Sequence, residues 1–135
     1  MKKIIFLTLL LLVSVGLALF IFRKGNQKEF EPQLKTFGRV EVTVTPKQIS
    51  RSKPVVFDLS FSNHAIDLSY DFREIMKLTD NLGNSYEAVS WDGGSGGHHV
   101  NGEISFGVLK KGVKNVALKL EGVDGVTETF KFNIN

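Results

Sequence analysis

The sequence predicts an all-β domain, an immunoglobulin-like β-sandwich of seven or eight antiparallel strands, preceded by one N-terminal transmembrane or signal helix. Apolar and polar residues alternate with a period of two through most of the chain after residue 37. Asn, Asp and Gly, which favour turns, recur about every 8 to 12 residues between these runs. Beyond the N-terminal segment, no long run has the 3.6-residue period of an amphipathic helix. A small β-barrel would have a similar pattern and is the alternative architecture.

Residues 1–24 have the properties of a signal anchor or transmembrane helix. The apolar run 4–22 contains 19 residues. As a helix with a rise of ~1.5 Å per residue it would span about 28 Å, close to the thickness of the hydrocarbon core of a bilayer. Basic residues flank the run on both sides, Lys2 and Lys3 before it and Arg23 and Lys24 after it. We therefore predict a single-pass anchor in the cell membrane, with the domain on the extracytoplasmic side.

Cleavage of the same segment is the alternative. Small residues that a signal peptidase could recognise occur within the run, at Ser14, Gly16 and Ala18. Cleavage there would leave apolar residues at the new N-terminus and would release a secreted domain. The length of the run and its abrupt basic end favour the uncleaved anchor.

The rest of the chain divides into a polar tether, 25–37, and a β-sandwich domain, 38–135. The tether has mixed charge and no sustained apolar period. Two hairpin turns are expected in the domain, at the DNLGN sequence that begins with Asp80 and at Asp124-Gly125. The predicted strands are 38–45, 54–62, 66–72, 75–79, 85–91, 102–108, 113–121 and a final run that ends at Ile134.

Length and composition exclude several classes of protein. A chain of 135 residues with a membrane segment has room for one domain, not for a multidomain enzyme. Without the four basic residues that flank the apolar run, 13 of the 17 Lys and Arg remain against 14 Asp and Glu, so the domain is nearly neutral. This balance gives no support to a nucleic-acid partner. The absence of cysteine excludes disulfides, thiol nucleophiles and thiolate metal sites.

A glycine-rich segment after the fifth predicted strand is the candidate binding loop. Its candidate residues are Trp91, Asp92, Gly93, Gly94, Gly96 and Gly97. The segment formally matches the G-x-S-x-G motif of hydrolases at Ser95. That motif requires a helix after the serine, whereas a strand pattern follows here. We therefore predict no catalytic residue and no enzyme activity, and interpret the segment as a flexible loop whose backbone can approach a ligand closely.

The histidines suggest a second type of site. His64, His98 and His99 all lie near predicted turns, and imidazole is a common ligand of zinc, copper and nickel. On a regular strand His98 and His99 would point to opposite faces, so only one of them could join His64. Hydrogen bonds from the histidines to loop carbonyls are the alternative. The carboxylates that could complete a metal site are those of Asp67, Asp71 and Asp92.

Three segments resemble an uncharacterised family of small prokaryotic extracytoplasmic β domains. Residues 63–72 resemble its THSxDLxxDL segment, residues 78–86 its L-x-D-x-x-G-x-x-Y hairpin, and residues 96–106 its GGHHRxGxLxF stretch, although Val100 replaces the basic residue. The resemblance implies a membrane-tethered external domain without a known reaction. It also suggests that four residues belong together, as a tentative metal-ligand set or as a shared hydrogen-bond network, namely His64, Asp67, His98 and His99.

These observations predict a membrane-anchored extracytoplasmic module with a non-catalytic binding or structural role. Its expected partners are the membrane, through residues 4–22, and an envelope or surface protein. No cofactor is expected in this role. The alternative function is a divalent metal-binding protein that uses the histidines near the glycine-rich loop.

Overall fold

The computed structural model describes residues 30–134. These residues form eight strands and one short helix, and all paired strands are antiparallel. The predicted all-β class is therefore confirmed. In chain order the elements are β1 (Gln33–Phe37), β2 (Val40–Gln48), β3 (Pro54–Ser62), α2 (Phe72–Ile75), β4 (Met76–Asp80), β5 (Ser85–Trp91), β6 (His99–Val108), β7 (Asn115–Val123) and β8 (Val126–Asn133). The predicted N-terminal helix, 1–24, lies outside the described residues. Within residues 30–134 no helix has the length and hydropathy needed to cross a membrane.

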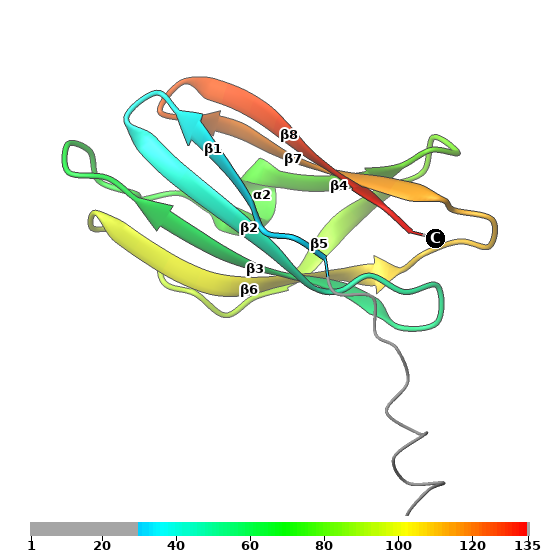
Figure 1. Cartoon of the computed structure of the whole chain (residues 1–135). Helices are drawn as coiled ribbons and strands as arrows, with labels where there is room; N and C mark the ends of the chain where they lie inside the picture. The colour runs from blue at the N-terminus through cyan, green and yellow to red at the C-terminus, as the bar shows by residue number, and fades with distance from the viewer. Residues whose placement is uncertain (1–29, 135) are drawn as a thin grey trace, which may run out of the picture.

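The strands follow one another in the order β1-β2-β3-β6-β5-β4-β7-β8. Strand β5 connects the two halves of this sheet, because its first residues pair with β4 and its last residues pair with β6. The register shifts between Ala88 and Ser90, where β5 changes partner. The sheet bends there, so that β2, β3 and β6 lie opposite β4, β7 and β8, and β1 lies beside β8 (Figure 1).

The two edge strands are joined by side chains. The Lys35 ammonium on β1 lies 2.8 Å from the Glu128 carboxylate on β8. The Gln33 amide on β1 donates a hydrogen bond of 2.9 Å to the Lys131 carbonyl on β8. These contacts cover part of the edge that unpaired strands would otherwise expose.

Apolar side chains from both halves of the sheet fill the space between them. Phe57 on β3 has ring-to-ring distances of 6.3 Å to Phe106 on β6 and 5.3 Å to Phe132 on β8. At the edge, Phe37 and Phe130 stack at 6.1 Å. The period-two alternation of the sequence places these side chains inward. On β2 and β3 the fully buried residues are Val40, Val42, Val44, Val55, Phe57, Leu59 and Phe61.

The predicted tether, 25–37, is wrong at its C-terminal end. Residues Gln33–Phe37 form strand β1, which pairs with β2 from Gln33 opposite Val44 to Phe37 opposite Val40. The segment contributes one fully buried side chain, that of Phe37, while Leu34 is 61% exposed. A short edge strand needs few apolar residues, so its sequence resembles that of a polar linker.

The predicted strand 66–72 is also wrong. Residues 63–71 form an irregular connection, and α2 begins at Phe72. The Asp71 carboxylate caps α2 by accepting hydrogen bonds from the backbone N–H groups of Arg73 and Glu74. Leu68 and Phe72 are still buried, so the apolar alternation reflected packing of a loop against the core and not a sheet ladder.

The domain has two distinct ends. The chain enters the described part at Phe30 and continues into β1 beside the end of β2, near the 49–53 turn. The irregular segment 63–71, the glycine-rich loop 92–98 and the turn at Asp124 lie at the opposite end (Figure 1). Since β2 and β3 are nine residues long, these ends are about 30 Å apart.

We predict that Phe57→Ala lowers the free energy of unfolding by about 3–5 kcal/mol, because it removes a ring packed against both halves of the sheet. Urea denaturation of the full chain measures this change. Leu34→Ala is the control and should change the free energy by less than about 0.5 kcal/mol, because Leu34 is exposed. Equal losses in the two variants would contradict the proposed position of the core.

Candidate functional site

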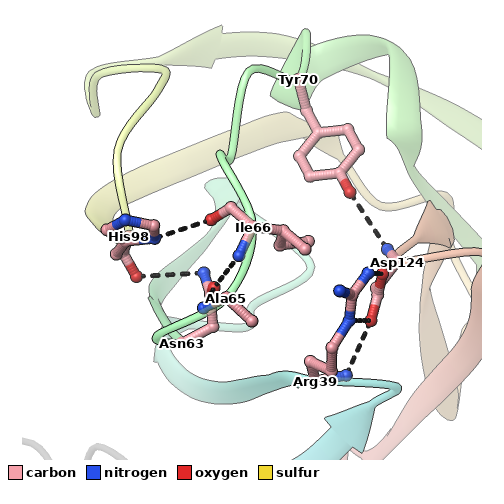
Figure 2. Close-up of polar contacts among 7 residues, drawn as sticks. All are labelled: Arg39, Asn63, Ala65, Ile66, Tyr70, His98 and Asp124. Carbon is pink, nitrogen blue, oxygen red and sulfur yellow. Dashed lines mark hydrogen bonds and ion pairs between the residues drawn. The ribbon is translucent and has the colours of Figure 1, made fainter.

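Two loops are joined at the end of the domain far from Phe30. The Leu68 N–H donates to the Gly97 carbonyl, and the Gly96 N–H donates to the Leu68 carbonyl, both at 2.9 Å. The Nδ1 atom of His98 lies 2.9 Å from the Ile66 carbonyl (Figure 2). The predicted binding loop is therefore held along the 63–71 segment by defined hydrogen bonds.

Asn63 is the centre of this junction, and its side chain is the buried polar group that sequence reasoning missed. The residue is 4% exposed. Its Oδ1 accepts hydrogen bonds from the Ala65 and Ile66 N–H groups, at 2.8 and 2.7 Å, and its Nδ2 donates to the His98 carbonyl at 3.2 Å (Figure 2). The preference of Asn for turns in which its side chain accepts a hydrogen bond from the N–H two residues later was the available signal.

Two more side chains of the candidate site fasten the same loops. The Gly97 N–H and the Ser69 hydroxyl both donate to the Asp67 carboxylate. These hydrogen bonds, the one from Ser69 first, lower the pKa of Asp67. The Ser95 hydroxyl donates to the Tyr70 carbonyl at 3.0 Å. The serine of the G-x-S-x-G match thus acts here as a structural donor between the loops.

The tentative metal ligands fall into two separate pairs. His64 and His99 have ring centres 5.8 Å apart. Asp67 and His98 instead bond to the backbone of the opposite loop, at Gly97 and at Ile66 respectively. Among residues 30–134 no three His, Asp or Glu side chains are grouped so that they could hold a metal ion. The four residues do not converge on one point.

An open cleft of about 480 Å³ lies beside Trp91. The Trp91 ring stacks on Phe72 at 4.9 Å, and its Nε1 donates to the Gly94 carbonyl at 3.1 Å. The indole is therefore held in place by its packing and by its hydrogen bond. The residues that surround the cleft are Ser69, Tyr70, Asp71, Phe72, Arg73, Trp91, Gly93, Gly94 and Ser95.

The glycines of the loop have different roles. A Cβ on Gly93 would lie 2.3 Å from the Trp91 ring and 2.5 Å from the Asn101 carbonyl, so only glycine allows the loop to pass over the indole. Gly94 has open space at its Cβ position. Asp92 pairs with Glu103 at the start of the loop, accepting its N–H through the carboxylate and donating its own N–H to the Glu103 carbonyl.

The irregular segment is fastened on its other side by an ion pair. The Tyr70 hydroxyl accepts the Asp124 N–H at 3.0 Å, and the Arg39 guanidinium contacts both oxygens of Asp124 at 2.9 and 2.6 Å (Figure 2). The hydrogen bond from the Arg39 side chain, followed by that from its backbone N–H, lowers the pKa of Asp124 to about 2. These residues come from three distant parts of the chain, and no local pattern connects them.

No protein-family model and no curated protein matches the chain. Among solved structures, the chain is similar to a crystal structure of a DUF4426 family protein from Pseudomonas aeruginosa PAO1. The identity is 12%, the match covers 76% of this chain and 92% of the other, and the TM-score is 0.43. The similarity at this level supports no statement about function.

We predict that the ion pair between Arg39 and Asp124 makes the free energy of unfolding decrease at low pH. Because the pKa of Asp124 is about 2 in the folded domain and 3.8 for an ordinary aspartate, its stabilising contribution is present above about pH 4 and is lost as the pH falls to 2. Asp124→Asn should reduce this loss, and asparagine tolerates the positive φ of 45° at this position. Urea denaturation at pH 5, 3 and 2 measures the effect.

Arg39→Met is the companion variant, because it removes the same ion pair from the other side. It should be less stable than the natural chain at pH 5 and similar to it at pH 2. An unchanged dependence on pH in both variants would show that this pair does not cause the acid sensitivity.

Proposed function

We propose that this chain is a membrane-anchored extracytoplasmic module with a non-catalytic binding role, which presents the cleft beside Trp91 to an envelope or surface protein. The observation that carries this proposal is that the start of the described chain and the cleft lie at opposite ends of the domain. The described part of the chain begins at Phe30, and the segments that line the cleft, 69–73 and 91–95, lie at the opposite end of the strands. A domain tethered at one end presents its other end to partners.

The order of the strands supports an immunoglobulin-like β-sandwich as the scaffold. From β2 onward it reads β2-β3-β6-β5-β4-β7-β8. An immunoglobulin domain with strands A to G has sheets ABED and CFG, which corresponds to the order A-B-E-D-C-F-G. In this correspondence β1 is an additional edge strand. Such scaffolds gather their loops at two ends, and the loops at one end commonly bind partners.

The proposed anchor in residues 4–22 would hold the domain near the membrane. Between Arg23 and Phe30 a fully extended chain spans at most about 25 Å. The end that contains the 49–53 turn would then face the bilayer. The loops that surround the cleft would lie about 30 Å farther out, because the strands of the domain separate the two ends.

The chemistry of the cleft supports recognition of a protein segment. Tyr70 and Trp91 are among the residues that surround the cleft, and so is Gly94, which is exposed. Arg73 also borders the cleft and is exposed, and its guanidinium makes no ion pair or hydrogen bond within the described part of the chain. Tyr, Trp and Arg are the residues enriched in protein interfaces. A peptide segment with an acidic side chain is the ligand that these groups would complement.

The positions of the polar side chains support a non-catalytic role. A hydrolytic serine needs a neighbouring base, and its hydroxyl must be free to form a hydrogen bond to that base. Here the Ser95 hydroxyl is directed at the Tyr70 carbonyl, and Asp67 and His98 bond to backbone groups of the facing loops. These side chains hold the cleft in shape.

We expect the full-length chain to remain in the membrane pellet after alkaline carbonate extraction, with its domain digested by protease added outside the cell. The intact mass of the extracted chain should include residues 1–24. A soluble chain shortened by about 16–18 residues would overturn the anchor and favour the secreted alternative.

We expect a photo-crosslinking side chain at position 94 to capture a protein partner in intact cells. Position 94 suits this probe because a Cβ there meets no atom within 4 Å. Adding Arg73→Ala to the probe-bearing chain should reduce the crosslinked product severalfold. A probe at Lys53, which is exposed at the other end of the domain, is the matched control and should give no such product. Equal products from both positions, or no loss with Arg73→Ala, would overturn the binding role assigned to the cleft.

A further inference from the structure

We propose that His64 and His99 form a two-imidazole site for a divalent transition-metal ion of the Zn²⁺, Ni²⁺ and Cu²⁺ class. The site lies outside the cleft and does not depend on the proposed partner. The two rings are exposed, their centres are 5.8 Å apart and their planes meet at 77°. No other pair of histidines in the described chain has a ring contact of this kind.

The end of the β3–β6 ladder brings the two residues together. Ser62 and His99 are the last register pair of these strands. His64 follows Ser62 by two residues, in the irregular connection that leaves β3, and its ring contacts that of His99. His98 instead turns to the Ile66 carbonyl. The contact therefore joins residues 35 apart in the sequence, and His98 is engaged with the Ile66 carbonyl instead.

The separation of the rings suits a shared ion. A metal ion lies about 2.0–2.1 Å from an imidazole nitrogen, hence about 3.2 Å from the centre of the ring. Two such rings would have centres about 5.2 Å apart at a tetrahedral angle and about 6.4 Å apart on opposite sides of the ion. The distance of 5.8 Å lies between these limits. Binding of one ion by both rings would require the two exposed side chains to rotate so that a nitrogen of each faces the ion.

The hydrogen bonds around the pair leave nitrogen atoms available to a metal ion. The Nδ1 of His99 lies 3.1 Å from the Ser62 hydroxyl, and this contact leaves its Nε2 open. A hydrogen bond at the second ring nitrogen orients a histidine ligand. His64 makes no hydrogen bond or ion pair within residues 30–134, so its ring is also available. Two nitrogen ligands favour zinc, nickel or copper over calcium or magnesium, which prefer oxygen.

Calorimetric titration of the full-length chain with ZnCl₂ and NiCl₂ tests the site. The protein is kept in detergent micelles and carries no polyhistidine tag, so its three histidines are the only imidazoles present. We expect one ion per chain, with no binding of CaCl₂. His64→Ala and His99→Ala should each weaken binding at least about tenfold, since each removes one of the two ligands.

The matched control is His98→Asn. This variant removes the third histidine, and its side-chain amide can still donate to the Ile66 carbonyl. Binding should stay within about threefold of that of the natural chain. His64→Gln and His99→Gln provide a second pair of variants that keep a polar side chain, and thermal unfolding confirms that each variant is folded.

The proposal is overturned if no saturable binding of either ion occurs up to about 1 mM. It is also overturned if binding survives both His64→Ala and His99→Ala, or if His98→Asn weakens it as much as they do. Shifts of the ring signals of His64 and His99 on addition of Zn²⁺, without a shift of those of His98, would be the expected result by nuclear magnetic resonance.

Discussion

Nine residues between β3 and α2 leave the sheet, and their backbone polar groups need partners that no strand provides. Buried or half-buried N–H and C=O groups without partners would cost about 1–3 kcal/mol each. The Asn63 side chain accepts hydrogen bonds from two of these N–H groups. The glycine-rich loop forms hydrogen bonds with both backbone groups of Leu68 and with the Ile66 carbonyl. The shape of this end of the domain follows from that requirement.

The same requirement explains why several residues that look catalytic or metal-binding in the sequence have structural partners. Asp67, Ser95 and His98 each form a hydrogen bond from one loop to the backbone of the other. On the far side Arg39 and Asp124 fix the position of Tyr70. With both sides of the segment fastened, the Trp91 cleft has walls of defined shape, so a ligand would not have to order them on binding.

The residues without such partners are the ones that remain available for recognition. Arg73 projects at the cleft, and His64 lies beside His99 at the end of the β3–β6 ladder. Both features lie at the end of the domain opposite Phe30. The apolar core therefore separates the end at which Phe30 enters from the end that carries these side chains.

The sequence by itself determined the all-β class and most of the strands, because a sheet with one buried face imposes period-two alternation on each strand. It did not distinguish β1 from a tether, since an edge strand buries little besides Phe37. Nor did it distinguish the 66–72 segment from a strand, because Leu68 and Phe72 pack on the core in the same alternation.

Only the tertiary structure decided how the candidate residues combine. The sequence placed His64, Asp67, His98 and His99 near turns, but it contains no information on which atoms of one loop face which atoms of another. The end of the β3–β6 ladder placed His99 near His64, whereas Asp67 bonds to the Gly97 N–H and His98 lies at the Ile66 carbonyl. Contacts across 30 or more residues depend on strand register and loop pairing, and these are properties of the folded chain.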